Sequence, residues 1–183
     1  MYRNLLMGTA ASAALVFAGA SAHAEKFSTV FSGFNEVGPL NAETGAILSE
    51  GTGTLDLDLD RSAQTLTFKL TFSGLSAPVT QSHIHFGKIH TPGGIVVFFC
   101  TNLGNGPAGT PACPAGGGTV TGTITAAGVI AVPGQNISAG DFDAISDALE
   151  SNTAYGNIHT TKFPGGEIRG QIHKGDRDDD DDR

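Results

Sequence analysis

The sequence predicts an all-β fold, an antiparallel β-sandwich with one short helix, with a β-barrel as the alternative. Two observations predict it: short segments alternate apolar and polar residues, and glycine-, proline- and asparagine-rich turns separate them. Segment 54–60, TLDLDLD, places Leu55, Leu57 and Leu59 on one face and aspartates on the other. Segment 65–72, TLTFKLTF, repeats this pattern. Both are typical of antiparallel strands with one face in the core.

About eight strands are expected in total. The segment 118–130 is a strand or a hairpin, and the run IVVFF at 95–99 is apolar on both faces, which places it centrally or under a covering element. The remaining expected strands, in chain order, are 26–34, then the segment that carries His83 and His85 before a turn at His90, and then 154–160 and 167–173.

One segment departs from the alternation. Residues 138–152, SAGDFDAISDALESN, carry apolar residues at helical spacing, with Ser138 as the expected N-cap and Asp141 three residues later. This segment predicts a short amphipathic helix.

The N-terminus indicates export. Residues 1–24 contain an early positive charge at Arg3, an apolar stretch of about 13 residues and a small-x-small end at Ala24, which is typical of a cleaved signal peptide. We therefore expect a secreted or periplasmic protein with no integral membrane segment after cleavage. A single domain is expected at 25–174, followed by a disordered acidic tail at 175–183.

The charge of the chain restricts its partners. The formal net charge is −8, and cleavage after Ala24 leaves 9 Lys and Arg against 18 Asp and Glu, a net charge of −9. This balance argues against nucleic acid or an anionic membrane surface as a partner. The sequence has no Gly-x-Ser-x-Gly nucleophile elbow, phosphate-binding loop or Cys-x-x-Cys-His haem motif, so binding is favoured over catalysis.

The two cysteines, Cys100 and Cys113, predict a disulfide, because pairs of cysteines in exported proteins are usually oxidised. Closing a loop of about 14 residues stabilises a fold by roughly 3 kcal/mol in the chain-entropy model. The segment between them is rich in glycine, proline and asparagine and has little to pack with. Free or metal-binding thiols are the alternative.

Histidines form the strongest chemical signal. In the segment QSHIHFGKIH, His83 and His85 are two residues apart, so on an extended strand they share one face while Ile84 and Phe86 share the other. Because the apolar pair must face the core, both imidazoles are expected to point away from it. This spacing lets the two rings bind one transition metal ion at about 2.0 Å.

His159 follows the same logic, since it alternates with an apolar residue at a strand end. We expect His83, His85 and His159 to bind one ion, with His90 or His173 as a fourth ligand. Copper is favoured over zinc because imidazole suits both and the Irving–Williams order favours copper. The alternative is a hydrogen-bonded polar cluster on the surface without a metal.

Two similar units carry these histidines. IHTPGGIVV (89–97) and IHTTKFPGGEIRG (158–170) each place a histidine near a Pro-Gly-Gly turn that leads into a strand, which we interpret as two similar hairpins. Glu167 and Arg169 are two residues apart on the second strand. Their favoured role is a structural salt bridge that holds this strand, rather than catalysis.

Three motifs carry a resemblance to a known family. FSGFNEVGP near the start of the exported chain, SHIHFG in the middle and NIHTTKFPGGEIRGQI near the end resemble the CHRD domain, named for repeats in chordin and found in exported bacterial proteins. The resemblance covers roughly residues 27–173. It implies an extracytoplasmic β domain and no particular chemistry.

A looser resemblance concerns the fold. The order of SHIHFG, a cysteine-bearing glycine loop, a later strand-end histidine and a late arginine is similar to copper/zinc superoxide dismutase, which implies a Greek-key topology. The resemblance implies that His83, His85 and His159 are copper ligands and that Arg169 lies near a substrate channel. However, five histidines remain after cleavage and the histidine-rich zinc loop is missing, so only a single-metal site is expected.

Three functions follow from these observations. The favoured one is binding of a single transition metal ion. The second is a metal-free structural or interaction module that contacts envelope or extracellular proteins. The third is an enzyme with superoxide dismutase-like redox chemistry.

Overall fold

The structure, a computed structural model, describes residues 24–37 and 45–175. The expected signal peptide and acidic tail therefore lie outside the described residues, apart from Ala24 and Gly175 at their inner ends.

Nine strands, one α-helix and three short 3-10 helices make up the described chain. In order they are β1 Glu25–Ser32, η1 Gly33–Asn35, β2 Thr52–Asp60, β3 Thr65–Ser73, β4 Val79–Phe86, β5 Gly94–Thr101, β6 Gly118–Thr125, η2 Ala126–Gly128, η3 Pro133–Gln135, α1 Phe142–Glu150, β7 Ala154–Thr160, β8 Ile168–Gln171 and β9 His173–Lys174.

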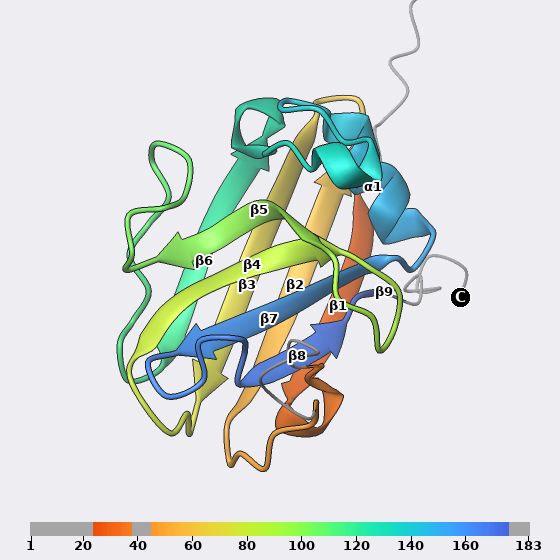
Figure 1. The fold of residues 1–183 in the computed structure, drawn as a ribbon. Coiled ribbons are helices and arrows are strands. Elements are labelled where there is room, and N and C mark those ends of the chain that lie inside the picture. Colours follow the sequence, from red (N-terminus) through yellow and green to blue (C-terminus); the bar gives the residue numbers. More distant parts are fainter. Residues whose placement is uncertain (1–23, 38–44, 176–183) are drawn as a thin grey trace, which may run out of the picture.

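The strands form two layers of one antiparallel sheet (Figure 1). The strand order is β5-β4-β7-β8-β1-β2-β3-β6, with β9 paired to β1. In Figure 1, β5, β4, β7 and β8 form the near layer, β6, β3, β2 and β1 form the far layer, and α1 packs at one end. Neighbours such as β4 and β7 are distant in sequence, so long connections cross between the layers, as in Greek-key folds. The predicted all-β sandwich with one short helix is confirmed.

The core lies between the two layers. The alternating leucines and phenylalanines of β2 and β3 point into it, as the sequence predicts, and are almost fully buried. Phe68 of β3 meets Phe99 of β5 across the sandwich, with ring centroids 4.8 Å apart. From the near layer, Ile84 of β4 and Ile158 of β7 enter the same core. The opposite faces of these two strands are therefore turned away from the core.

The helix begins later than the sequence predicts. Its N-cap is Asp141, whose side chain accepts a hydrogen bond from the backbone N–H of Ala144. The prediction that Ser138 caps the helix is therefore wrong. Gly140 has a φ of 82°, and this left-handed residue turns the chain just before the cap. The segment predicted at 118–130 is a strand that ends at Thr125 and continues as a 3-10 turn.

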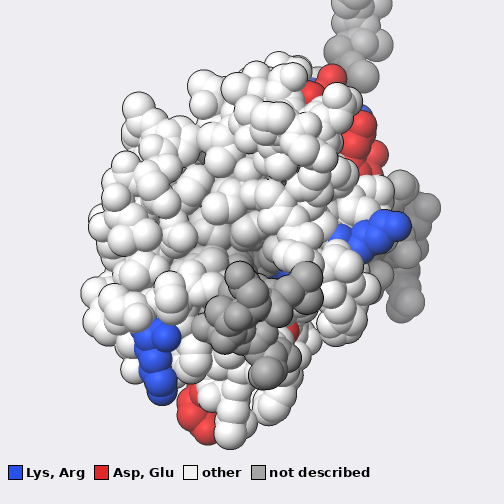
Figure 2. All heavy atoms as spheres, in the orientation of Figure 1, with Lys and Arg blue, Asp and Glu red and all other residues white. Residues whose placement is uncertain are grey.

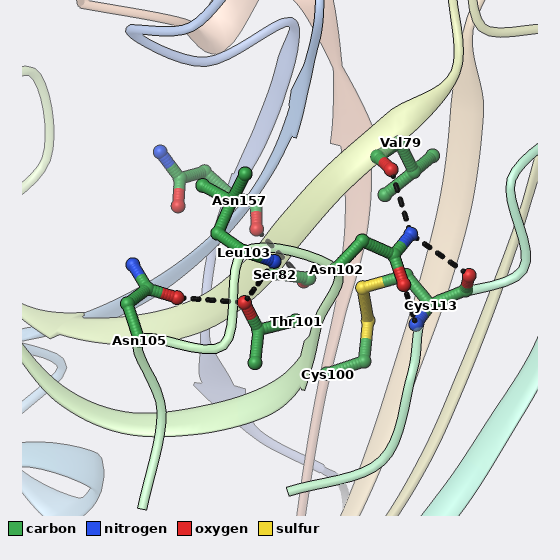
Figure 3. Close-up of a disulfide and its surroundings, with 9 residues drawn as sticks. All are labelled: Val79, Ser82, Cys100, Thr101, Asn102, Leu103, Asn105, Cys113 and Asn157. Atoms are coloured by element: carbon green, nitrogen blue, oxygen red, sulfur yellow. Dashed lines mark hydrogen bonds between the residues drawn. A yellow bond between two sulfur atoms is a disulfide. The ribbon is translucent and has the colours of Figure 1, made fainter.

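Cys100 and Cys113 form a disulfide, which ties the end of β5 to the glycine-rich loop after it (Figure 3). Asn102 supports the same loop: its side-chain amide donates to the carbonyl oxygens of Val79 and Cys113 and accepts from the N–H of Cys113. Both cysteines are buried in the core. The loop is therefore held by a covalent bond and by hydrogen bonds, those of Asn102 and one from the N–H of Thr101 to the carbonyl oxygen of Pro111 among them, rather than by apolar packing of its own.

Replacing both cysteines by alanine is expected to lower the free energy of unfolding by about 3 kcal/mol, because the unfolded chain regains the freedom of the closed loop. Urea unfolding of the oxidised wild type and the double variant measures this difference. A reductant should destabilise the wild type and leave the variant unchanged. A loss below about 0.5 kcal/mol in the variant would mean that the hydrogen bonds of the loop hold it without the disulfide.

Candidate metal centre

The pairing of β4 with β7 builds the candidate site. The two strands are antiparallel neighbours, with His83 opposite Asn157 and Gln81 opposite His159. Residues that alternate with Ile84 and Ile158 lie on the face turned away from the core. His83, His85 and His159 therefore lie on one patch of the outer face, although the last is more than 70 residues away in sequence.

The three imidazoles are in contact. The ring centroid of His83 is 4.6 Å from that of His85 and 4.6 Å from that of His159. One nitrogen from each ring lies within 4.8 Å of the others. Two nitrogens bound to one ion at about 2.0 Å lie about 3.3–4.0 Å apart, so side-chain shifts of about 1 Å would bring all three to a common ion.

Burial distinguishes this group from a surface cluster. His83 is 0 % exposed, His85 is 8 % exposed and His159 is 6 % exposed. Neither ring nitrogen of His83 has a hydrogen-bond partner, and Nε2 of His159 has none either. A buried polar atom without a partner costs about 1–3 kcal/mol, so such groups are rare in proteins unless they bind something.

The two Pro-Gly-Gly turns orient the other rings. Nδ1–H of His85 donates to the carbonyl oxygen of Gly93 at 2.8 Å, and Nδ1–H of His159 donates to the carbonyl oxygen of Pro164 at 2.8 Å. Each bond places the proton on Nδ1 and leaves the lone pair on Nε2. Metal-binding histidines are usually oriented in this way, by a carbonyl or carboxylate on the nitrogen that does not bind the metal.

Burial also keeps the three rings uncharged. Desolvation lowers the pKa of His83 well below its ordinary value and lowers the pKa of His85 to about 4, and it lowers the pKa of His159 as well. The neighbouring rings add to the effect on His83, because two imidazolium ions this close would repel. At neutral pH the rings are therefore in the neutral form that binds metal.

Aromatic rings and one arginine enclose the group. Phe98 of β5 meets His83 edge-on, with ring centroids 5.1 Å apart, and Tyr155 of β7 stacks on His85 at 4.7 Å with the planes 5° apart. The guanidinium of Arg169 lies 3.4 Å from the ring centroid of Tyr155 on β7. Its Nη2 donates to two carbonyl oxygens of the loop after β4, those of residues 88 and 91, which fixes that loop beside the site.

Asn157 lies among the histidines. Its Oδ1 is 3.1 Å from Nε2 of His85. Burial lowers the pKa of His83, and the side chain of Asn157 opposes this effect in part. Nε2 of His85 carries a lone pair, because its Nδ1 holds the proton. The amide oxygen and the imidazole nitrogen face each other at this distance, and each has a lone pair with which it can bind one cation.

The other predicted residues lie elsewhere. His90 and His173 are exposed and border a hollow of about 500 Å³ that none of the three clustered histidines lines. Glu167 and Arg169 do not form the expected salt bridge; each side chain binds other groups. The Glu167 carboxylate accepts from the hydroxyls of Ser49 and Thr160 and from the N–H of Ser76. It joins three segments of the chain beside the site.

Sequence reasoning missed Tyr155, Asn157 and Phe98. The first two alternate with His159 in AYGNIHT, so the period that grouped the histidines could also have placed them on the same face. Phe98 gave no such signal, because β5 is apolar on both faces.

Comparison with known protein families identifies the family of this chain. The CHRD domain matches residues 27–172, most of the chain. The protein belongs to the CHRD-domain family. Membership and the disulfide fit an extracellular protein. No curated protein and no solved structure matches the chain. Within the described part of this CHRD-domain protein, no helix has the length and apolar character to cross a membrane.

The metal-free CHRD domain is expected to lose stability as the pH falls below 6.5. The pKa of His85 is about 4 in the folded state against about 6.5 when unfolded, so the unfolded chain binds more protons in this window. The loss from His85 alone reaches about 2 kcal/mol by pH 5 and on the order of 3 kcal/mol below pH 4.

Urea unfolding in the presence of a chelator, at intervals from pH 7.5 to 5, measures this slope. A His173→Gln variant, which changes an exposed histidine, should keep it, whereas His85→Gln should reduce it. A flat profile for the wild type would contradict the expected burial of the rings.

His83→Leu is expected to raise the free energy of unfolding of the metal-free domain by about 1–3 kcal/mol at pH 7.5, because it removes two buried nitrogens without partners. His159→Leu is the matched control, since the same change there deprives the Pro164 carbonyl of its donor. Chemical unfolding compares the two variants. Equal destabilisation by both would show that the nitrogens of His83 are satisfied in solution.

Proposed function

We propose that this CHRD-domain protein is an exported metal-binding protein that holds one copper ion through His83, His85 and His159. Export rests on the signal peptide expected at residues 1–24, with cleavage after Ala24.

One observation carries the proposal. Three neutral imidazoles meet at a buried point with His83 unpartnered on both nitrogens, and with Nε2 of His85 and of His159 left as lone pairs by the carbonyls that hold their Nδ1–H groups. A cluster that served only as packing would be expected to pair these nitrogens with hydrogen-bond partners. The arrangement has the ligands and the orienting carbonyls of a metal site.

Copper is favoured over zinc by the donor set. Imidazole binds both ions, and at equal availability the Irving–Williams order places copper above zinc. Binding is favoured over catalysis, since the sequence offers none of the nucleophile or cofactor motifs that would point to a reaction.

Metal content after dialysis tests the proposal. The untagged domain is loaded in separate samples with copper, under oxidising and under anaerobic reducing conditions, and with zinc. The copper-loaded domain is expected to retain about one copper per chain. His83→Leu should retain less than a tenth of that amount. The matched control is His90→Asn combined with His173→Gln, which removes two histidines outside the cluster and suits the left-handed backbone of residue 90.

Equal copper retention by His83→Leu and the wild type would remove the site. In the absence of retention by the wild type under any condition, the metal-free structural or interaction module becomes the better account of this domain.

A further inference from the structure

The charge around the three histidines decides which ion they suit. Among the described residues, the group of possible metal ligands consists of the three imidazoles, with no Asp, Glu or Cys among them. Arg169 brings a positive charge close to the group: its guanidinium lies 3.4 Å from the ring centroid of Tyr155, and that ring stacks on His85 at 4.7 Å. An ion bound here would therefore meet neutral ligands and a nearby cation.

The neighbouring carboxylates interact with other groups of the protein. Glu167 is fully buried, and its two oxygens accept the three hydrogen bonds from Ser49, Ser76 and Thr160. Glu36 is also buried, and its negative charge acts on Arg169 and Tyr155. On the visible surface of this face, uncharged residues predominate (Figure 2).

The fourth donor within reach is neutral as well. Asn157 places an amide oxygen 3.1 Å from Nε2 of His85. A set of three imidazoles and one amide supplies lone pairs to an ion but leaves its charge uncompensated.

This composition penalises a doubly charged ion. The cost of moving an ion from water into a low-dielectric interior rises with the square of its charge, so a dication loses about four times as much solvation as a monocation of the same size. A dication could offset the lost solvation by binding together with hydroxide or another anion. The ligand side chains are only 0–8 % exposed, so they leave little room for such an anion.

Geometry also favours a singly charged ion, copper(I). Copper(II) prefers four or more ligands in a square-planar or tetragonal arrangement. Here the three rings come from two adjacent strands, and one nitrogen of each lies within 4.8 Å of the other two, so three ligands can surround one ion. Copper(I), with a filled d shell, has no such preference and accepts three ligands.

We propose that this site selects copper(I) over copper(II) and zinc(II), and that the neutral side chain of Asn157 sets this preference. The inference rests on the proposed copper site and adds the oxidation state to it. Such a site holds copper in its reduced form and raises the copper(II)/copper(I) reduction potential above that of the ion in water.

Competition with chromogenic chelators tests the preference in the wild-type protein. Dissociation constants are measured for copper(I) under anaerobic conditions and for copper(II) and zinc(II), all at pH 7.5. We expect copper(I) to bind at least 100-fold more tightly than either dication. For copper, a 100-fold ratio corresponds to a reduction potential about 120 mV higher than that of the unbound couple.

Asn157→Asp tests the cause. The change keeps the shape of the side chain and adds one negative charge beside His85, so the ratio of copper(I) to copper(II) affinity should fall at least tenfold, about 60 mV in potential. Gln64→Glu is the matched control, because it adds the same charge without changing the shape of an exposed side chain in the turn between β2 and β3, which belong to the other layer. Its ratio should equal that of the wild type.

The outcomes separate the two proposals. If the wild type binds none of the three ions, the copper site itself is wrong. If it binds copper(II) or zinc(II) as tightly as copper(I), the site stands and the selectivity is overturned. A wild-type preference for copper(I) that Asn157→Asp leaves unchanged would overturn the role of Asn157. The wild-type ratio does not depend on whether the variant folds.

Discussion

The antiparallel pairing of β4 with β7 is the constraint on which the site depends. It places His83 directly across from Asn157 and brings His159 beside Gln81, so the outer face of two strands distant in sequence becomes one surface. A shift of one residue would turn the histidines of one strand into the sandwich and its isoleucines out of it. Burial of Ile84 and Ile158 therefore sets the register, and the register sets where the imidazoles meet.

Much of this arrangement could be predicted from alternation alone. The period of two in the leucine-rich strands gave the core face of β2 and β3, and the same period in SHIH and NIH gave the shared face of the histidines. The cysteine pair was likewise predictable from composition and export. These features are local, since each depends on the direction in which neighbouring side chains leave an extended backbone.

Features made by distant segments could not be predicted. Phe98 and Tyr155 pack against the rings of His83 and His85, and the carbonyl oxygens of Gly93 and Pro164 orient His85 and His159; sequence alone does not place these groups. Gly93 is needed there, because a Cβ atom would lie 1.9 Å from the carbonyl oxygen of Phe86. The separate engagement of Glu167 also depends on segments far apart in the chain.

The two faces of β4 and β7 have separate tasks. One face supplies the interior that holds the sandwich together, and the other carries the polar rings of the candidate site. Substitutions on the outer face can therefore accumulate while the domain keeps its shape, provided that the isoleucines remain. In this architecture, relatives could exchange one ligand chemistry for another, or lose it, without rebuilding the scaffold.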